Sequence, residues 1–319
     1  MMTRLRHVNL NHLDLNWPLG IKLGAIALLV GAIAACTSPP ADVATPDGAE
    51  PTAETSEVEA ADAQSVEGAD RVVALSSLTA DIVANLDNEK LVGMPGNPLF
   101  SEDPKFEGIE VVSQGRIEPD LEKIVALEPD LVVGALGFHD TTLASLEELG
   151  IEVLAVDAAN WDSLKAITTD LAERTGTSSD ELMARYDACL AQAPETAPSA
   201  IVLVSRQPLL SPNKESWAGD FLAQFNIPNL TADLQGDSPF DGYITLPEEK
   251  VLTVNPEMLL VIDTGDNLLE QLKGDAFWGE LAATQQEQVH SFEYLGLVNP
   301  GSIASIEATC EKLAALGSS

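Results

Sequence analysis

Basic residues are scarce in this sequence, which has 16 Lys and Arg against 51 Asp and Glu and a formal net charge of −35. Such a surface repels phosphate backbones, so nucleic acid is excluded as a partner. Histidines are scarce too: beyond residue 70 only His139 and His290 remain, too few for a three-histidine zinc or manganese site. Bare ferric iron would need several tyrosines, and the chain has only Tyr186, Tyr243 and Tyr294.

Long apolar runs are also lacking. The run Leu23–Ala35 falls short of the roughly 20 residues that a spanning helix needs. It follows three bases and ends at Cys36, which predicts a secretory signal over residues 1–35. The small residues before Cys36 resemble the bacterial lipoprotein box, which implies cleavage there and lipid on Cys36. An ordinary signal peptide, or an uncleaved anchor with a chance cysteine, is the alternative. In each case the body is exported.

Residues 36–70 have a composition typical of a segment that does not fold by itself. From Thr37 to Asp70 there are nine acids and no base, aromatic residue, leucine or isoleucine. Such a segment cannot bury enough apolar surface to offset its ordering entropy. We therefore predict a solvated, self-repelling tether between the membrane and a folded body.

Apolar runs alternate with helical patterns from Arg71 onward, which predicts an α/β fold with parallel-type sheets. Strands and helices alternate over residues 71–177, which we interpret as a first lobe. Residues 178–194 carry only helical spacing and predict a connecting helix. Alternation resumes over residues 195–319, which predicts a second lobe.

One unit occurs twice, as "LEKIVALEPDLVV" (Leu121–Val133) and "EEKVLTVNPEMLL" (Glu248–Leu260). Together with "RVVALSSLTADIV" and "SPNKESWAGDFLAQFNIPNL", it resembles the substrate-binding proteins of ABC importers for ferric siderophores, haem and vitamin B12. The resemblance implies two Rossmann-like lobes joined by one long rigid helix, with a small ligand bound between them. It also implies a partner, a permease dimer with its ATPase, docked by Glu122 and Glu249. Without the resemblance, these are solvated acids in a first helical turn.

Ligand contacts are expected in the loops that follow the strands, since α/β proteins bind ligands at strand carboxyl ends. Arg116 and Arg206 suit a carboxylate- or hydroxamate-bearing iron(III) chelate, because arginine presents a planar fork of donors. The alternative is that each arginine pairs with one of the many acids. Trp161 and Trp217 are either ligand contacts or core residues. The further candidates are Ser77, Asn97, Phe138, His139, Lys214, Phe240, Tyr243 and Tyr294.

Several alternatives stay open at this point. Haem is one, because His139, Tyr243 or Tyr294 offers an axial ligand, and cobalamin is another. A secreted α/β hydrolase is a third, although no G-x-S-x-G, Walker or G-x-G-x-x-G motif is present. A purely structural lipoprotein is the fourth. Cys189 and Cys310 form an even pair in an oxidising compartment, so a disulfide or two buried thiols are both permitted.

Overall fold

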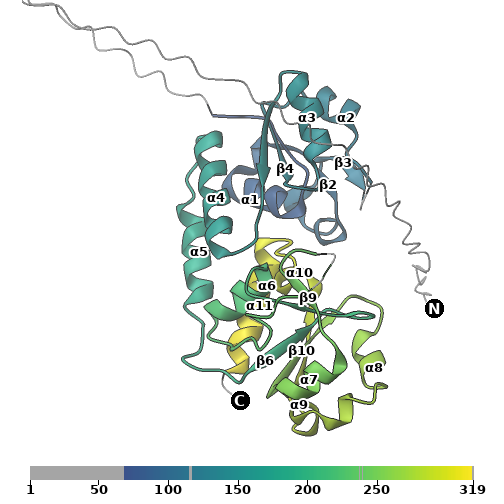
Figure 1. Ribbon diagram of the computed structural model, residues 1–319. Coiled ribbons are helices and arrows are strands. Elements are labelled where there is room, and N and C mark those ends of the chain that lie inside the picture. Colours follow the sequence, from purple (N-terminus) through teal and green to yellow (C-terminus); the bar gives the residue numbers. More distant parts are fainter. Residues whose placement is uncertain (1–67, 115–116, 237, 239, 318–319) are drawn as a thin grey trace, which may run out of the picture. The chain divides into compact units, whose positions relative to one another are not determined.

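The computed structural model describes residues 68–114, 117–236, 238 and 240–317 (Figure 1). Contacts divide the chain into two units, Met1–Ala61 and Asp62–Ser319, and the described residues all belong to the second. The predicted signal, Cys36, the tether up to residue 67, and Arg116 lie outside the described residues. Within the described ranges, every helix is too short or too polar to cross a membrane.

The first lobe is built on a five-stranded sheet in which all neighbouring strands are parallel. In spatial order its strands are β3 (Glu110–Gln114), β2 (Leu91–Gly96), β1 (Val72–Ala74), β4 (Leu131–Ala135) and β5 (Glu152–Val156). Its helical segments are α1 (Ser77–Asp87), η1 (Asn88–Lys90), η2 (Pro98–Phe100), η3 (Pro104–Phe106), α2 (Leu121–Ala126) and α3 (Asp140–Glu148). The order 3-2-1-4-5 is that of a Rossmann-like doubly wound sheet, which confirms the predicted fold class.

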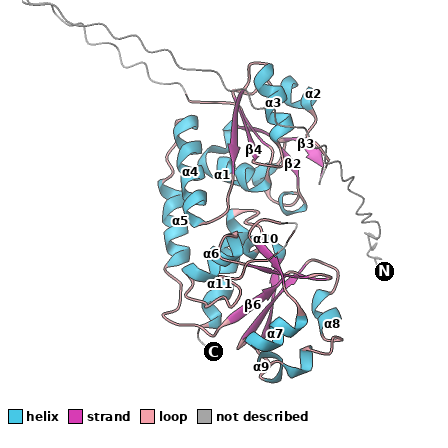
Figure 2. Ribbon diagram, viewed as in Figure 1, coloured by secondary structure: helices cyan, strands magenta, loops and turns pink. Residues whose placement is uncertain are grey.

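The second lobe combines a parallel sheet with an antiparallel one (Figure 2). The parallel strands are β11 (Val289–Glu293), β10 (Met258–Asp263) and β6 (Ala200–Leu203). The antiparallel strands, which the sequence analysis did not predict, are β7 (Ser205–Arg206), β8 (Leu209–Pro212) and β9 (Tyr243–Thr245). All four residues of β8 are buried, so this short strand lacks the polar–apolar alternation that identifies a strand. The helical segments are α6 (Trp217–Gln224), α7 (Glu248–Val254), α8 (Leu268–Leu272), η4 (Trp278–Glu280), α9 (Ala282–Gln285), α10 (Tyr294–Leu297) and α11 (Ile303–Leu316).

The repeated sequence unit forms the same structure in each lobe. The offset of 127 residues that relates the two sequence copies also relates α2 to α7 and β4 to β10. Leu131 of β4 pairs with Val72, and the equivalent Met258 of β10 pairs with Ala200. Even the backbone strain recurs, because the residue before the proline has a positive φ in both copies (Glu128, 46°, and Asn255, 41°).

The two lobes share one hydrophobic core. Along each central strand the side chains alternate between two faces. In β4, Leu131 and Val133 belong to a cluster that also contains Leu260 and Ile262 of β10, whereas Val132 faces a separate cluster within the first lobe. Both sheets are therefore buried on two faces, as parallel sheets require. The shared cluster fixes the lobes to each other by packing as well as by chain connectivity.

Two helices, α4 (Trp161–Thr175) and α5 (Asp180–Leu190), connect β5 of the first lobe to β6 of the second (Figure 1). The segment predicted as the connecting helix contains α5. Gly176 ends α4 in the left-handed conformation (φ 66°), which glycine adopts without strain. Cys189 of α5 and Cys310 of α11 form a disulfide bond, with Cα atoms 5.6 Å apart. Of the two possibilities for these cysteines, the structure therefore shows the bridge, which joins the connecting segment to the second lobe.

Candidate functional site

Elements that follow strand carboxyl ends make the contacts between the lobes. At the start of α4, after β5, the Trp161 backbone N–H donates to Oδ2 of Asp220 in α6 at 2.9 Å. In α1, after β1, Oδ2 of Asp81 accepts from the backbone N–H of Ile303 in α11 at 2.6 Å. The carboxyl ends of both parallel sheets therefore lie toward the face where the lobes meet, which is where α/β proteins bind ligands.

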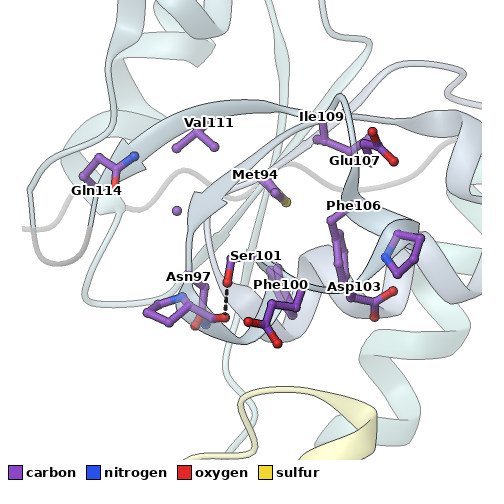
Figure 3. A pocket seen from close by; sticks show the side chains of 14 residues that line it. Met94, Asn97, Phe100, Ser101, Asp103, Phe106, Glu107, Ile109, Val111 and Gln114 are labelled. Carbon is purple, nitrogen blue, oxygen red and sulfur yellow. Dashed lines mark hydrogen bonds between the residues drawn. The ribbon is translucent and has the colours of Figure 1, made fainter. Parts of the chain in front are cut away.

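Three adjoining cavities mark this face. The first-lobe cavity, about 650 Å³, lies between β2, β3 and the η2–η3 segment, where Met94, Phe100 and Phe106 contribute apolar walls (Figure 3). An interlobe cavity of about 280 Å³ shares Phe100 and Asp103 with it. The second-lobe cavity, again about 650 Å³, lies at the ends of β10 and β11 and is lined by Tyr294 and residues of α11.

Exposed apolar side chains are concentrated near strand ends. Of the seven large apolar side chains that are exposed among the described residues, five lie within three residues of the end of β3, β4 or β11 or of the start of β9. Phe138 is 89% exposed and Ile117 is 72% exposed. We call these five residues the apolar rim: Ile117, Leu136, Phe138, Phe240 and Tyr294. Clustered exposed apolar surface is typical of a binding site rather than of ordinary protein surface.

Two predicted polar residues lie in first-lobe loops. Asn97 lines the first-lobe cavity and its Nδ2 donates to Oγ of Ser77 at 2.5 Å, which joins two predicted contacts. The His139 Nδ1 accepts from the Ala135 backbone N–H at 2.9 Å, and burial lowers the pKa of His139. The neutral ring therefore carries its proton on Nε2, which leaves neither nitrogen free to ligate haem iron.

The two predicted second-lobe bases are paired with acids. Nε and Nη2 of Arg206 donate to the two carboxylate oxygens of Asp275, at 2.8 and 2.5 Å. This bidentate ion pair lowers the pKa of Asp275 and satisfies the arginine fork. Lys214 pairs with Asp233 at 2.7 Å on the surface. The acid-paired alternative for Arg206 is the one that the structure shows.

Tyr243 is half-buried close to Tyr294. Burial, followed by the charge that Tyr294 would carry, raises the pKa of Tyr243, so its phenol stays protonated at neutral pH. Bare ferric iron binds tyrosine as phenolate, which this environment disfavours. No cluster of three or more His, Cys, Asp or Glu among the described residues has the geometry to hold a metal ion.

Trp161 and Trp217, which the sequence left as either ligand contacts or core residues, are core residues. Each is less than 5% exposed, and their rings stack with centroids 5.6 Å apart. The Trp217 Nε1 donates to the Gly296 carbonyl at 2.8 Å, and Phe221 packs edge-on against both rings. Trp161 begins α4 and Trp217 begins α6, so the stack joins the connecting segment to the second lobe. It offers no surface to a ligand.

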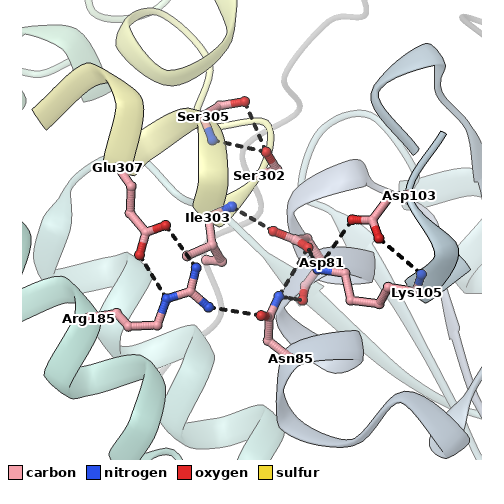
Figure 4. A network of polar contacts seen from close by, with 9 residues as sticks. All are labelled: Asp81, Asn85, Asp103, Lys105, Arg185, Ser302, Ile303, Ser305 and Glu307. Atoms are coloured by element: carbon pink, nitrogen blue, oxygen red, sulfur yellow. Dashed lines mark hydrogen bonds and ion pairs between the residues drawn. The ribbon is translucent and has the colours of Figure 1, made fainter. Parts of the chain in front are cut away.

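A polar network crosses between the lobes beside the interlobe cavity (Figure 4). At its centre, the buried carboxylate of Asp81 accepts from Lys105 Nζ at 2.7 Å and from Asn85 Nδ2 at 3.0 Å, in addition to Ile303 N. By accepting from the Ile303 backbone N–H, Asp81 also caps the positive N-terminus of α11. This one carboxylate therefore joins α1, η3 and α11.

Arg185 of α5 extends the network. It makes a bidentate ion pair with Glu307 of α11, at 2.7 and 2.9 Å, and its Nη1 donates to Asn85 Oδ1 at 2.9 Å. One helical turn further along, Cys189 and Cys310 close the disulfide between the same two helices. The sequence analysis missed these residues, since an acid or base inside an amphipathic helix resembles any solvated one.

Glu122 and Glu249 occupy the same position in the two repeats. Each is the second residue of its helix and each is exposed. Asp120 caps α2 by accepting from the Glu122 and Lys123 backbone N–H groups. Within the described residues, neither glutamate side chain takes part in an ion pair, so both carboxylates are available to a partner.

Ile117 and Leu136 belong to the apolar rim although they were not predicted as ligand contacts. Their signal in the sequence is an isolated apolar residue immediately beyond a strand end, in a loop where burial is not expected. That signal is weak, because single exposed apolar residues are common on proteins. Only their concentration with Phe138 near strand ends makes them significant.

Comparisons with known proteins agree on one family. The family model described as "periplasmic binding protein" matches residues 72–293. The chain is 27% identical over 220 residues to the vitamin B12-binding protein of Salmonella typhimurium, covering 66% of this chain and 78% of that protein. It is 23% identical over 239 residues to YvrC, an ABC transporter substrate-binding lipoprotein of Bacillus subtilis, covering 70% and 72%. The crystal structure of the catecholate-siderophore binding protein VctP from Vibrio cholerae has a similar fold, with a TM-score of 0.64, 17% identity and coverage of 78% and 94%.

Proposed function

Because this chain belongs to the periplasmic binding protein family, we propose that it captures an iron(III) chelate between its lobes and delivers it to an ABC permease. Proteins of this family bind substrates for transport and are not enzymes. The chain acts by binding and release, with no chemical step. The predicted lipid on Cys36 and the acidic tether would hold it at the extracytoplasmic membrane surface, near its permease and the attached ATPase.

The observation that carries this proposal is the repeated α2–β4 and α7–β10 unit, with Glu122 and Glu249 at the same position of each. Two similar lobes that present one exposed acid each are suited to a permease with two-fold symmetry and a base on each half. Ion pairs at the edge of a protein–protein interface fix the orientation of the partners and speed their association more than they add affinity. The apolar rim and adjoining cavities provide the surface for the ligand.

A docking variant tests the proposal. We expect Glu122→Ala combined with Glu249→Ala to reduce ATP-driven ligand uptake into permease proteoliposomes at least about tenfold, because both ion pairs are lost. Ligand affinity, measured by calorimetry on the same variant, should stay unchanged, since neither acid is on the apolar rim.

Glu148→Ala combined with Glu311→Ala is the matched control, because it removes two exposed acids at other positions. Normal uptake in the docking variant would place the permease contact elsewhere on the protein. Loss of ligand affinity in the docking variant would place the acids in the ligand site instead.

A further inference from the structure

The charge and polarity of the apolar rim indicate which class of metal chelate this protein binds. This inference rests on the proposed function. Four of the five rim side chains are wholly hydrocarbon, and the fifth, Tyr294, has one hydroxyl group on an aromatic ring. Burying such side chains against a ligand is favourable only when the ligand offers apolar surface in return.

Among the described residues, the two bases predicted in second-lobe loops are paired with acids, and Lys312 of the second-lobe cavity lies over the Phe292 ring. Arg206 gives its fork to Asp275, whose carboxylate is only 11% exposed, and Lys214 is held by Asp233. Releasing Arg206 to a ligand would leave Asp275 as an unpaired, largely buried carboxylate, which is unfavourable. Neither base is therefore available to an anion without breaking an existing pair.

Exposed acids lie next to rim residues in the sequence. Asp140 is two residues after Phe138, Asp241 follows Phe240, and Glu293 precedes Tyr294, and all three are exposed. The whole chain adds a formal charge of −35. A ligand with several negative charges would therefore approach against repulsion that salt only partly screens.

We propose that the ligand is a neutral or cationic metal chelate with an apolar exterior, of the kind that hydroxamate groups form with ferric iron, and not a polyanionic chelate such as ferric citrate. The apolar exterior packs on the rim from both lobes, and the surrounding acids select against negative charge. Selectivity then arises from repulsion of wrong ligands as well as from attraction of the right one.

Calorimetric titration of the full chain tests this class directly. The probes are ferrioxamine B, a cationic hydroxamate chelate, cyanocobalamin, which is neutral, and ferric citrate, each at low and high sodium chloride. We expect ferrioxamine B or cyanocobalamin to bind at least about a hundredfold more tightly than ferric citrate at low salt, with the preference reduced at high salt.

Alanine variants of rim residues test whether the apolar rim contacts the ligand. Phe138→Ala and Phe240→Ala should each weaken binding of the preferred probe about tenfold, through loss of buried aromatic surface. Leu149→Ala is the matched control, because Leu149 is also exposed but lies at the end of α3, outside the rim. The Leu149→Ala variant should bind the preferred probe as tightly as the parent protein does.

The outcomes separate this inference from the proposed function. Tighter binding of ferric citrate overturns the ligand class and leaves the importer function intact. The same conclusion holds if the protein binds its permease but neither the neutral nor the cationic probe, or if the rim variants bind as the parent does. Absence of both probe binding and permease binding overturns the proposed function, and this inference with it.

Discussion

Asp81 offers the most exacting test of how the lobes are held together. Its carboxylate is 3% exposed and accepts hydrogen bonds from a lysine, an asparagine and the backbone at the start of α11. Asp81→Ala removes the acceptor and leaves the donors in place. We therefore expect a loss of stability that exceeds the value of an ordinary surface ion pair.

The magnitude follows from the groups that lose their partner. An unsatisfied Ile303 N–H costs about 1–3 kcal/mol, and a charged hydrogen bond such as that from Lys105 is worth about 1.5–3 kcal/mol. Lys105 is 27% exposed and regains part of its hydration, so the two values do not simply add. We expect Asp81→Ala to lower the free energy of unfolding by about 3–4 kcal/mol. Asp81→Asn, which keeps an acceptor oxygen for Ile303, should cost about 1–2 kcal/mol.

Equilibrium unfolding in guanidinium chloride, followed by circular dichroism, measures both variants. Glu173→Ala is the control, since Glu173 is an exposed helical acid, and its effect should stay within about 0.5 kcal/mol. A double-mutant cycle of Asp81→Ala with Lys105→Met then isolates the ion pair from the capping of α11. A cost below about 1 kcal/mol for Asp81→Ala would show that water satisfies the orphaned groups and that this carboxylate does not hold the lobes together.

Two further predictions concern the bridge and the pH dependence of stability. Replacing Cys189 and Cys310 together by serine should lower the free energy of unfolding by about 2–5 kcal/mol, because the bridge closes a loop of 121 residues in the unfolded chain; equal denaturation midpoints for the variant and the oxidised parent would contradict this. Burial places the pKa of folded His139 below the unfolded value near 6.5, so the unfolded chain binds a proton more readily and stability should fall as the pH drops below about 6.5. His139→Gln should reduce that slope in denaturation curves taken between pH 7.5 and 5, and an unchanged slope would show that this histidine does not contribute.

The repeated unit is predictable from sequence because its determinants are local. In each copy a short helix ends before a proline, which cannot continue it, and a buried strand follows. Glu122 and Glu249 take their equivalent positions from this unit alone.

Features that depend on distant partners are not predictable in the same way. Arg206 has a loop position that suits a ligand, yet its partner Asp275 lies 69 residues further along the chain. Trp161 and Trp217 each begin a helix, where a tryptophan can equally face a ligand, and only their mutual stacking identifies them as core. In each case the outcome is decided by tertiary packing, about which local spacing carries no information.

The shared core also bears on how a ligand is captured. Residues of both parallel sheets, α4, α5 and α11 belong to one buried cluster, and a disulfide ties α5 to α11. A large hinge motion would expose part of this cluster to water at about 25 cal/mol per Å², and would break the buried contacts of Asp81 as well. We therefore expect the lobes to keep nearly the same relation with and without ligand. A surface that is already formed loses little entropy on binding, so affinity depends chiefly on how well the ligand matches the apolar rim.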